Sequence, residues 1–157
     1  MSVFLDTSAL VKLVVQEPET GALRGYLRER AELRRVASAL ARTELRRTLM
    51  RLGLPDAADA LLEDLVLVRL DDSLLDAAGT LGGPVLRSLD AIHLACAMRV
   101  PALTAVVTYD VRMQQAAQAL GCRSWLRGPL RRPCPPTRVL DSSSAAGGSS
   151  SPRATRR

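Results

Sequence analysis

Two aspartates follow short apolar runs at positions where carboxylates could do chemistry. Asp6 comes directly after residues 3–5, and Asp110 comes directly after residues 104–109. If these two runs are neighbouring parallel strands, both carboxylates lie at the same edge of a sheet, where metal-dependent sites form. Aspartate is also a leading N-cap residue, so capping of the helix that follows is the alternative interpretation for each of them.

A third acid, Asp90, lies in a stretch that is apolar on almost every side, residues 88–99. This pattern predicts a buried helix, in which a carboxylate needs compensation. The compensation is either a helix dipole behind an N-capping Ser88 or a metal ion. His93 follows one turn later on the same face, and we interpret it as a packed core histidine, with contact to Asp90 or a substrate as the alternative.

A fourth acid, Glu44, lies roughly 100° around its predicted helix from the centre of the apolar stripe. By itself this position is typical of a solvated boundary residue, paired with Arg47 or Thr48. The residues around Glu44 therefore assign it no chemistry.

Several kinds of site are excluded by residue type. The single histidine and the three cysteines without CxxC spacing cannot build a disulfide framework or a Cys/His zinc site. A Ser-His-Asp or Cys-His nucleophile would have to use His93 inside its apolar stretch, which disfavours acyl transfer. Because there is no apolar run of about 18 residues and no leader before Asp6, we expect a cytoplasmic protein without a membrane span.

The elements that must position the acids alternate between strand and helix. Short apolar runs predict strands at residues 3–5, 36–38, 66–70 and 104–109. Amphipathic or capped stretches predict helices at residues 9–15, 20–30, 41–52, 57–65, 73–81, 88–99 and 111–120. Repeated strand–helix units joined by short loops predict an α/β protein with a central, mainly parallel sheet flanked by helices.

The charge and composition of the chain change near residue 120. The length of 157 residues fits a single domain, and the net charge is +6. Residues 1–120 carry a net charge of −1, whereas residues 121–157 carry +7 and are rich in Arg, Pro, Ser and Gly. Such a composition cannot bury enough apolar surface to offset its ordering entropy. We therefore predict a domain over residues 1–124 and a disordered tail over residues 125–157, which an extension or a frameshift would explain.

Four stretches carry a family resemblance: LDTSALVKL with EPE shortly after it, VASALARTELRR, RSLDAIHLACA and VVTYD. Together they resemble the successive motifs of the PIN-domain family, specifically the VapC toxins of bacterial toxin–antitoxin pairs. The resemblance covers residues 2–121, and its specificity comes from the order and spacing of the four motifs. One departure follows Gly121, where the family usually ends in a short apolar strand and this chain has CRSWLR.

The resemblance implies a PIN-like α/β/α sandwich that cleaves RNA with Mg²⁺ or Mn²⁺. It assigns the catalytic, metal-binding acids to Asp6, Glu44, Asp90 and Asp110 and supporting hydroxyl groups to Thr7, Ser8 and Thr108. Oxygen donors without nitrogen or sulfur ligands suit these hard cations. In the implied mechanism the metal polarises a phosphoryl oxygen and activates the attacking water. Flanking arginines could hold phosphates, although a solvated role is simpler for each of Arg42, Arg46, Arg47, Arg87 and Arg112.

The resemblance also implies partners: a VapB-type antitoxin, an RNA substrate and a homodimer. The apolar faces of the helices at residues 20–30 and 39–52 could form part of a partner groove, although such stripes usually face the protein's own core. If the four acids converge, repulsion and burial are expected to raise their pKa values above about 4.

Other functions fit less well. A receiver domain needs a lysine near the end of its last strand, and the only lysine is Lys12. A haloacid-dehalogenase phosphatase needs an acid where Ser8 stands. The remaining alternative is a catalytically silent PIN-like module that binds RNA or protein, because a fold does not establish activity. RNA cleavage that EDTA abolishes would distinguish the enzyme from this module.

Overall fold

The computed structural model describes residues 1–82 and 86–125 of the chain. Its centre is a five-stranded sheet in the order β3-β2-β1-β4-β5, with parallel pairing throughout. The strands are β1 (Ser2–Leu5), β2 (Arg34–Ser38), β3 (Val66–Val68), β4 (Leu103–Val107) and β5 (Ser124–Trp125). The predicted α/β class with a parallel sheet is confirmed.

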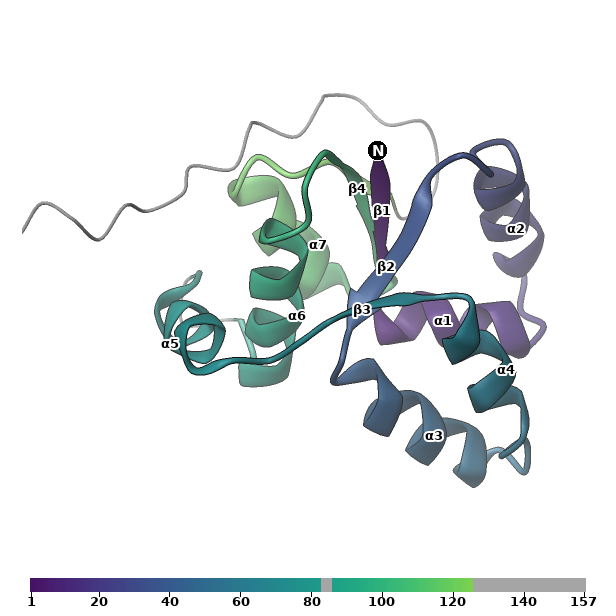
Figure 1. Cartoon of the computed structure of the whole chain (residues 1–157). Helices are drawn as coiled ribbons and strands as arrows, with labels where there is room; N and C mark the ends of the chain where they lie inside the picture. Colours follow the sequence, from purple (N-terminus) through teal and green to yellow (C-terminus); the bar gives the residue numbers. More distant parts are fainter. Residues whose placement is uncertain (83–85, 126–157) are drawn as a thin grey trace, which may run out of the picture.

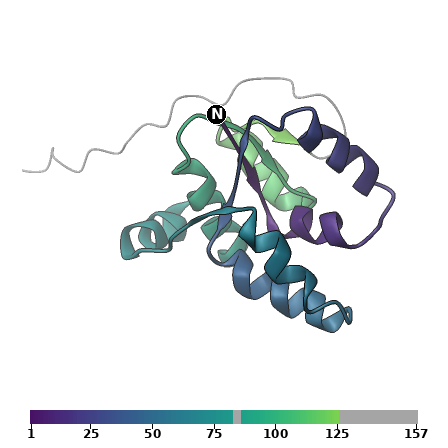
Figure 2. The ribbon, with the colours of Figure 1, turned by 45° about the vertical axis from the view of Figure 1, so that its right-hand side comes forward.

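Helices cover both faces of this sheet (Figures 1 and 2). One layer contains α1 (Thr7–Val14), α2 (Thr20–Arg28), α3 (Ala41–Arg51) and α4 (Ala57–Glu63). The other contains α5 (Asp72–Thr80), α6 (Ser88–Met98) and α7 (Val111–Ala119). The result is the expected α/β/α sandwich, and within the described residues no helix is both long and apolar enough to cross a bilayer.

Strand β1 shows why the sequence needs a continuous apolar run. Val3 and Leu5 point into the core beneath the first helix layer, whereas Phe4 points into the core beneath the second. A strand that is covered on both faces buries every side chain, so alternation with polar residues is not possible.

The apolar stripes of α2 and α3 face mainly the protein's own core, the second of the two interpretations open for them, and a partner groove along them stays a prediction. Leu23 of α2 and Leu45 and Leu49 of α3 are completely buried in the first core. The stripe of α3 ends at Gly53, whose φ of 74° is easily adopted only by glycine. Burial against the sheet explains these three leucines without a partner, whereas Leu52 after the end of α3 is 51% exposed.

A fifth strand, β5, forms after Gly121 despite the polar CRSWLR sequence. Strand β5 pairs in parallel with β4, and Val106 N donates to Arg123 O at 2.8 Å. The family's edge strand is therefore present in a shortened form that extends one residue past the predicted domain boundary at residue 124. The predicted disordered tail lies outside the described residues from residue 126 onward.

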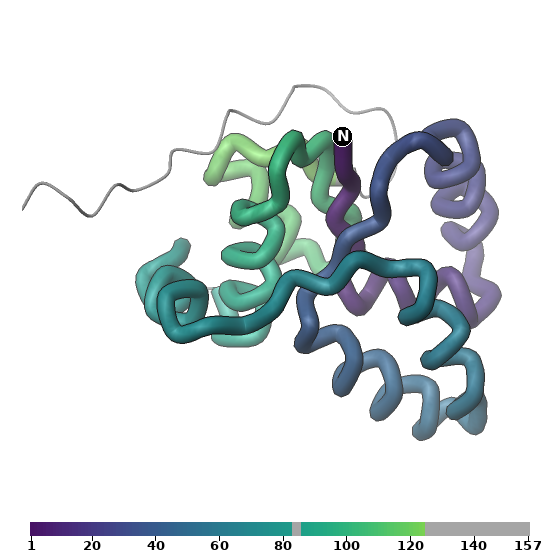
Figure 3. Tube along the Cα trace, viewed as in Figure 1, coloured from purple at the N-terminus to yellow at the C-terminus, as the bar shows by residue number. Residues whose placement is uncertain are grey.

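The chain reverses its direction across the sheet between β3 and β4, as the tube in Figure 3 lets the reader follow. It builds outward from β1 through β2 to β3, and then returns to place β4 on the other side of β1. Helices α1 and α7, which follow β1 and β4, therefore pack on opposite faces. Such a switch point opens a crevice at the carboxyl ends of the two strands.

Candidate active site

Asp6 lies at this switch point, at the end of β1. Its backbone N–H donates to Val107 O of β4 at 2.9 Å, and its side chain caps α1. The Oδ2 atom accepts hydrogen bonds from Ser8 Oγ at 2.7 Å, Ser8 N at 3.3 Å and Thr108 Oγ1 at 3.1 Å. With 7% exposure, Asp6 is a buried and firmly held carboxylate.

Asp110 lies beside it, after the end of β4. Its Oδ1 atom caps α7 by accepting from Arg112 N at 2.7 Å and Met113 N at 3.2 Å. The backbone N–H of Asp110 donates to Thr108 Oγ1 at 3.1 Å, the same hydroxyl that donates to Asp6. Capping and a shared sheet edge, the two interpretations open for this pair, therefore hold together.

Asp90 approaches the same edge from the first turn of α6 and is half-buried. Burial is the largest cause that raises its pKa, followed by the negative charges of Asp110 and Asp6. Its Oδ2 atom is buried without a hydrogen-bond partner among the described residues. The expected N-cap Ser88 is wrong, because Ser88 is the first helical residue and the cap is Arg87, without a side-chain cap.

Glu44 faces inward from the first turn of α3, with 24% of its side chain exposed. Its Oε2 atom accepts from Thr7 Oγ1 at 2.5 Å and lies 2.7 Å from His93 Nε2. Burial favours a higher pKa, but the hydrogen bonds from His93 and Thr7 outweigh it and lower the pKa of Glu44. Both the solvated interpretation of Glu44 and the expectation of a raised pKa are therefore wrong.

His93 is buried as predicted, with 2% exposure, yet it is more than a packing residue. Its ring meets Phe4 edge to face, with centroids 6.5 Å apart. Nδ1 lies 3.8 Å from Asp6 Oδ1 and has no hydrogen-bond partner in the described part of the chain. Desolvation lowers the pKa of His93, but Glu44 and the nearby aspartates raise it more. Its spacing one turn after Asp90 was the feature of the sequence that indicated a role near the acids. Nothing in the neighbouring sequence indicated its contact with Glu44.

The hydrogen bonds divide the carboxylate oxygens of the four acids into held and open atoms. Donors from the described residues occupy one oxygen each of three acids: Asp6 Oδ2, Glu44 Oε2 and Asp110 Oδ1. They leave open the second oxygen of each of these acids and both oxygens of Asp90. Anionic oxygens that lack protein donors are the ligands that Mg²⁺ and Mn²⁺ prefer, so the donor set fits such an ion.

The acids do not form a closed metal shell as they stand. Within residues 1–82 and 86–125, no three His, Cys, Asp or Glu side chains are close enough together to hold a metal ion. Asp90 is the acid whose side chain forms no hydrogen bond with another described residue, so this side chain can rotate toward the others at the least cost.

The flanking arginines differ in their surroundings. Arg46 is engaged by Asp59, with Nη2 and Oδ1 2.6 Å apart, and Arg112 Nε lies 3.8 Å from Asp110 Oδ1. The side chains of the remaining three are exposed and form no hydrogen bond or ion pair with another described residue: Arg42, Arg47 and Arg87. These exposed guanidinium groups are the ones available to phosphates.

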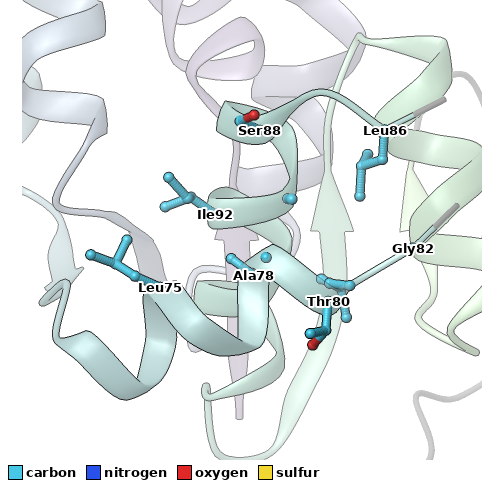
Figure 4. A pocket seen from close by; sticks show the side chains of 10 residues that line it. Leu75, Ala78, Thr80, Gly82, Leu86, Ser88 and Ile92 are labelled. Carbon is cyan, nitrogen blue, oxygen red and sulfur yellow. The ribbon is translucent and has the colours of Figure 1, made fainter. Parts of the chain in front are cut away.

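A pocket of about 390 Å³ opens nearby, between α5 and α6 (Figure 4). Its lining includes the apolar side chains of Leu75, Ala78, Leu86 and Ile92 together with Thr80 and Ser88. None of the four acids lines it. The pocket is therefore a feature separate from the acidic edge.

The fold is an α/β/α sandwich with aspartates at its switch point. Comparison of the sequence with protein families identifies the class to which it belongs. The model of the PIN domain matches residues 3–119, and the chain belongs to the PIN-domain family. The resemblance found in the four motifs is confirmed.

Relatives of this chain within the family are named VapC ribonucleases. Ribonuclease VapC46 of Mycobacterium tuberculosis is 50% identical over 123 residues, which cover 76% of this chain and 93% of the relative. Ribonuclease VapC35 of the same organism is 45% identical over 124 residues, covering 75% and 91%. A solved structure, VapBC2 from Rickettsia felis bound to a DNA fragment from their promoter, aligns with a TM-score of 0.55. It covers 74% of this chain and 93% of that chain at 14% identity, and so supports the fold.

Proposed function

We propose that the chain is a divalent-metal-dependent endoribonuclease, the toxin of a VapBC toxin–antitoxin pair that acts in the cytoplasm. Its relatives VapC46 and VapC35 are named ribonucleases, and the sequence similarity covers nearly their whole length. The observation that carries the proposal is Asp90, whose buried Oδ2 has no hydrogen-bond partner among the described residues, while burial and then the charges of Asp110 and Asp6 oppose its ionisation. Partly buried carboxylates that oppose one another's ionisation are costly unless a cation compensates them.

The open carboxylate oxygens would hold that cation. Asp6, Asp90 and Asp110 would ligate it directly, and Glu44 would do so directly or through water. When bound, Mg²⁺ or Mn²⁺ supplies positive charge to the phosphate that is attacked and lowers the pKa of the attacking water.

The remaining residues of the site hold the acids in place. Ser8 and Thr108 donate to Asp6 Oδ2, and Thr7 donates to Glu44 Oε2. Hydrogen bonds to a carboxylate favour its ionised form, which is the form that binds a cation. They also restrict rotation of the side chain, so that less entropy is lost when the metal site closes.

RNA would reach this edge through its phosphates. The exposed side chains of Arg42, Arg47 and Arg87 would attract the RNA backbone without reading its sequence. Selection among RNAs would come from folded shape and from single-stranded loops, whose backbone can bend into a crevice.

The antitoxin partner follows from the same relationships. The solved neighbour is a VapBC complex, and VapC relatives imply a VapB-type partner for this chain. Expression of the native operon should yield a stable complex with a small second polypeptide. Purification of this chain alone at full yield from that operon would argue against the toxin assignment. A homodimer stays a prediction.

A cleavage assay tests the enzymatic assignment. Purified protein is incubated with a structured RNA that contains single-stranded loops, in Mg²⁺, in Mn²⁺ and in EDTA. We expect cleavage with either metal, none with EDTA and none with Asp6→Asn or Asp110→Asn prepared identically, which controls for contaminating nuclease. Folded wild-type protein that binds RNA but never cleaves it would instead support the silent module.

A further inference from the structure

His93 is a buried polar residue that the proposed chemistry leaves without a task. A buried imidazole loses hydration at both nitrogens, and in this protein only Nε2 gains a hydrogen bond from the described residues. An apolar side chain would fill the same space beside Phe4 at lower cost. The position therefore points to a role for the ring beyond packing.

His93 and a second donor, Thr7, contact the same oxygen atom of Glu44. Thr7 Oγ1 and His93 Nε2 both lie against Glu44 Oε2, at 2.5 and 2.7 Å. These three residues come from three helices: Thr7 begins α1, Glu44 lies in the first turn of α3 and His93 lies in α6. An ionised carboxylate only accepts hydrogen bonds, so Nε2 is the donor of this pair.

The two donors fix a flexible side chain. Glutamate has several rotatable bonds, and holding one carboxylate oxygen from two directions removes much of that freedom before any ligand arrives. Both bonds use Oε2, which leaves Oε1 without a donor from the described residues. The side chain is thus held by one oxygen and open at the other.

We propose that His93 is a positioning residue for the divalent cation: by donating from Nε2 to Glu44 Oε2, it holds Glu44 so that Oε1 is available to the ion or to its water. This inference rests on the proposed function. Removing a residue that orients a metal ligand in this way typically weakens metal affinity by about 10- to 100-fold.

The test compares two amides at position 93. The side-chain nitrogen of glutamine in His93→Gln can occupy the place of Nε2, whereas the shorter amide of His93→Asn ends near the place of Nδ1. Calorimetric titration with Mn²⁺ alone, without RNA, measures affinity for the wild type and both variants. We expect about tenfold or weaker binding for His93→Asn and recovery of most of the affinity in His93→Gln.

A double-mutant cycle shows whether His93 acts through Glu44. In a Glu44→Gln background, His93→Asn should weaken Mn²⁺ binding no further, because the carboxylate that it positions is gone. If His93→Asn fails to fold by circular dichroism, His93→Leu replaces it, since leucine fills the space and carries no donor.

The outcomes separate this inference from the proposed function. Equal Mn²⁺ affinity in His93→Asn and wild type, or loss of affinity in His93→Gln as large as in His93→Asn, overturns the positioning role while wild-type cleavage stands. A further loss in the Glu44→Gln background overturns it as well. Wild-type protein that neither binds Mn²⁺ nor cleaves RNA overturns both.

Discussion

Glu44 Oε2 and His93 Nε2 lie 2.7 Å apart, although 49 residues separate them in the chain. The contact joins α3 of one helix layer to α6 of the other at the carboxyl edge of the sheet. It shifts the two groups in opposite directions, lowering the pKa of Glu44 and raising that of His93. The pair is therefore an ionic cross-link between the layers.

The stability that this pair provides should depend on pH. A lowered pKa of Glu44 contributes stability above its unfolded value near 4.5, and this contribution is lost as the pH falls through the folded value. The raised pKa of His93 contributes stability below its unfolded pKa of about 6.5, and this stability is lost as the pH rises through the pKa of the folded state. In EDTA, Glu44→Gln should lower the free energy of unfolding by about 1–3 kcal/mol near pH 5.5 and by less at pH 9. Urea melts at both pH values measure this, and an equal loss at both would contradict it.

Replacing Asp90 should stabilise the metal-free protein. Its raised pKa means that ionisation costs stability as the pH climbs above the unfolded value of 3.8. Asp90→Asn removes that charge at nearly constant shape, so its melting temperature in EDTA should exceed that of the wild type at pH 7, and the difference should shrink toward pH 4. The matched control is Asp59→Asn, which removes an exposed acid paired with Arg46. A lower melting temperature for Asp90→Asn at pH 7 would contradict the electrostatic account.

Divalent metal should stabilise the wild type more than the variants of its acids. An ion that binds only the folded state adds about 2.7 kcal/mol at one hundred times its dissociation constant. Thermal melts with and without Mn²⁺ should show this gain for the wild type and for Asp59→Asn, and a much smaller gain for Asp6→Asn and Asp90→Asn. The same response in all four proteins would rule out the metal assignment of these acids.

The segment after residue 126 should be dispensable for folding and cleavage. The described fold is complete at β5, and no proposed ligand lies beyond Asp110. A chain that ends after residue 126 should keep its melting temperature and its cleavage rate. Its RNA affinity should fall less steeply with salt, because most of the arginines of the +7 segment are gone. Precipitation of the shortened protein would show that the segment supports the core.

The sequence predicted the fold and two of the acid positions because local signals were strong. The apolar run before Asp6 and the run before Asp110 each indicated a buried strand, and a parallel sheet places both strand ends at one edge. Prediction from the sequence failed where a structure depends on contacts with elements that are distant in the chain. Strand β5 has a polar sequence and forms because β4 offers an open edge for pairing.

The environment of Glu44 could not be predicted for the same reason. Helical periodicity places it at the margin of the apolar stripe, where the expected partners, Arg47 or Thr48, are nearer in sequence than His93. Its burial and its partner depend on how α3 and α6 approach across the end of the sheet, and this packing is not encoded in either helix alone.

The central place of β1 in the sheet has a consequence for the lifetime of the site. Amide hydrogens of β1 are covered by β2 and β4, so they should exchange with deuterium only when the whole domain unfolds, whereas edge strands β3 and β5 exchange by local fraying. Asp6 continues β1 and is bonded to Val107 of β4. We therefore expect the edge that carries Asp6 and Asp110 to open among the slowest parts of the described domain and to keep its geometry while the edge strands fray.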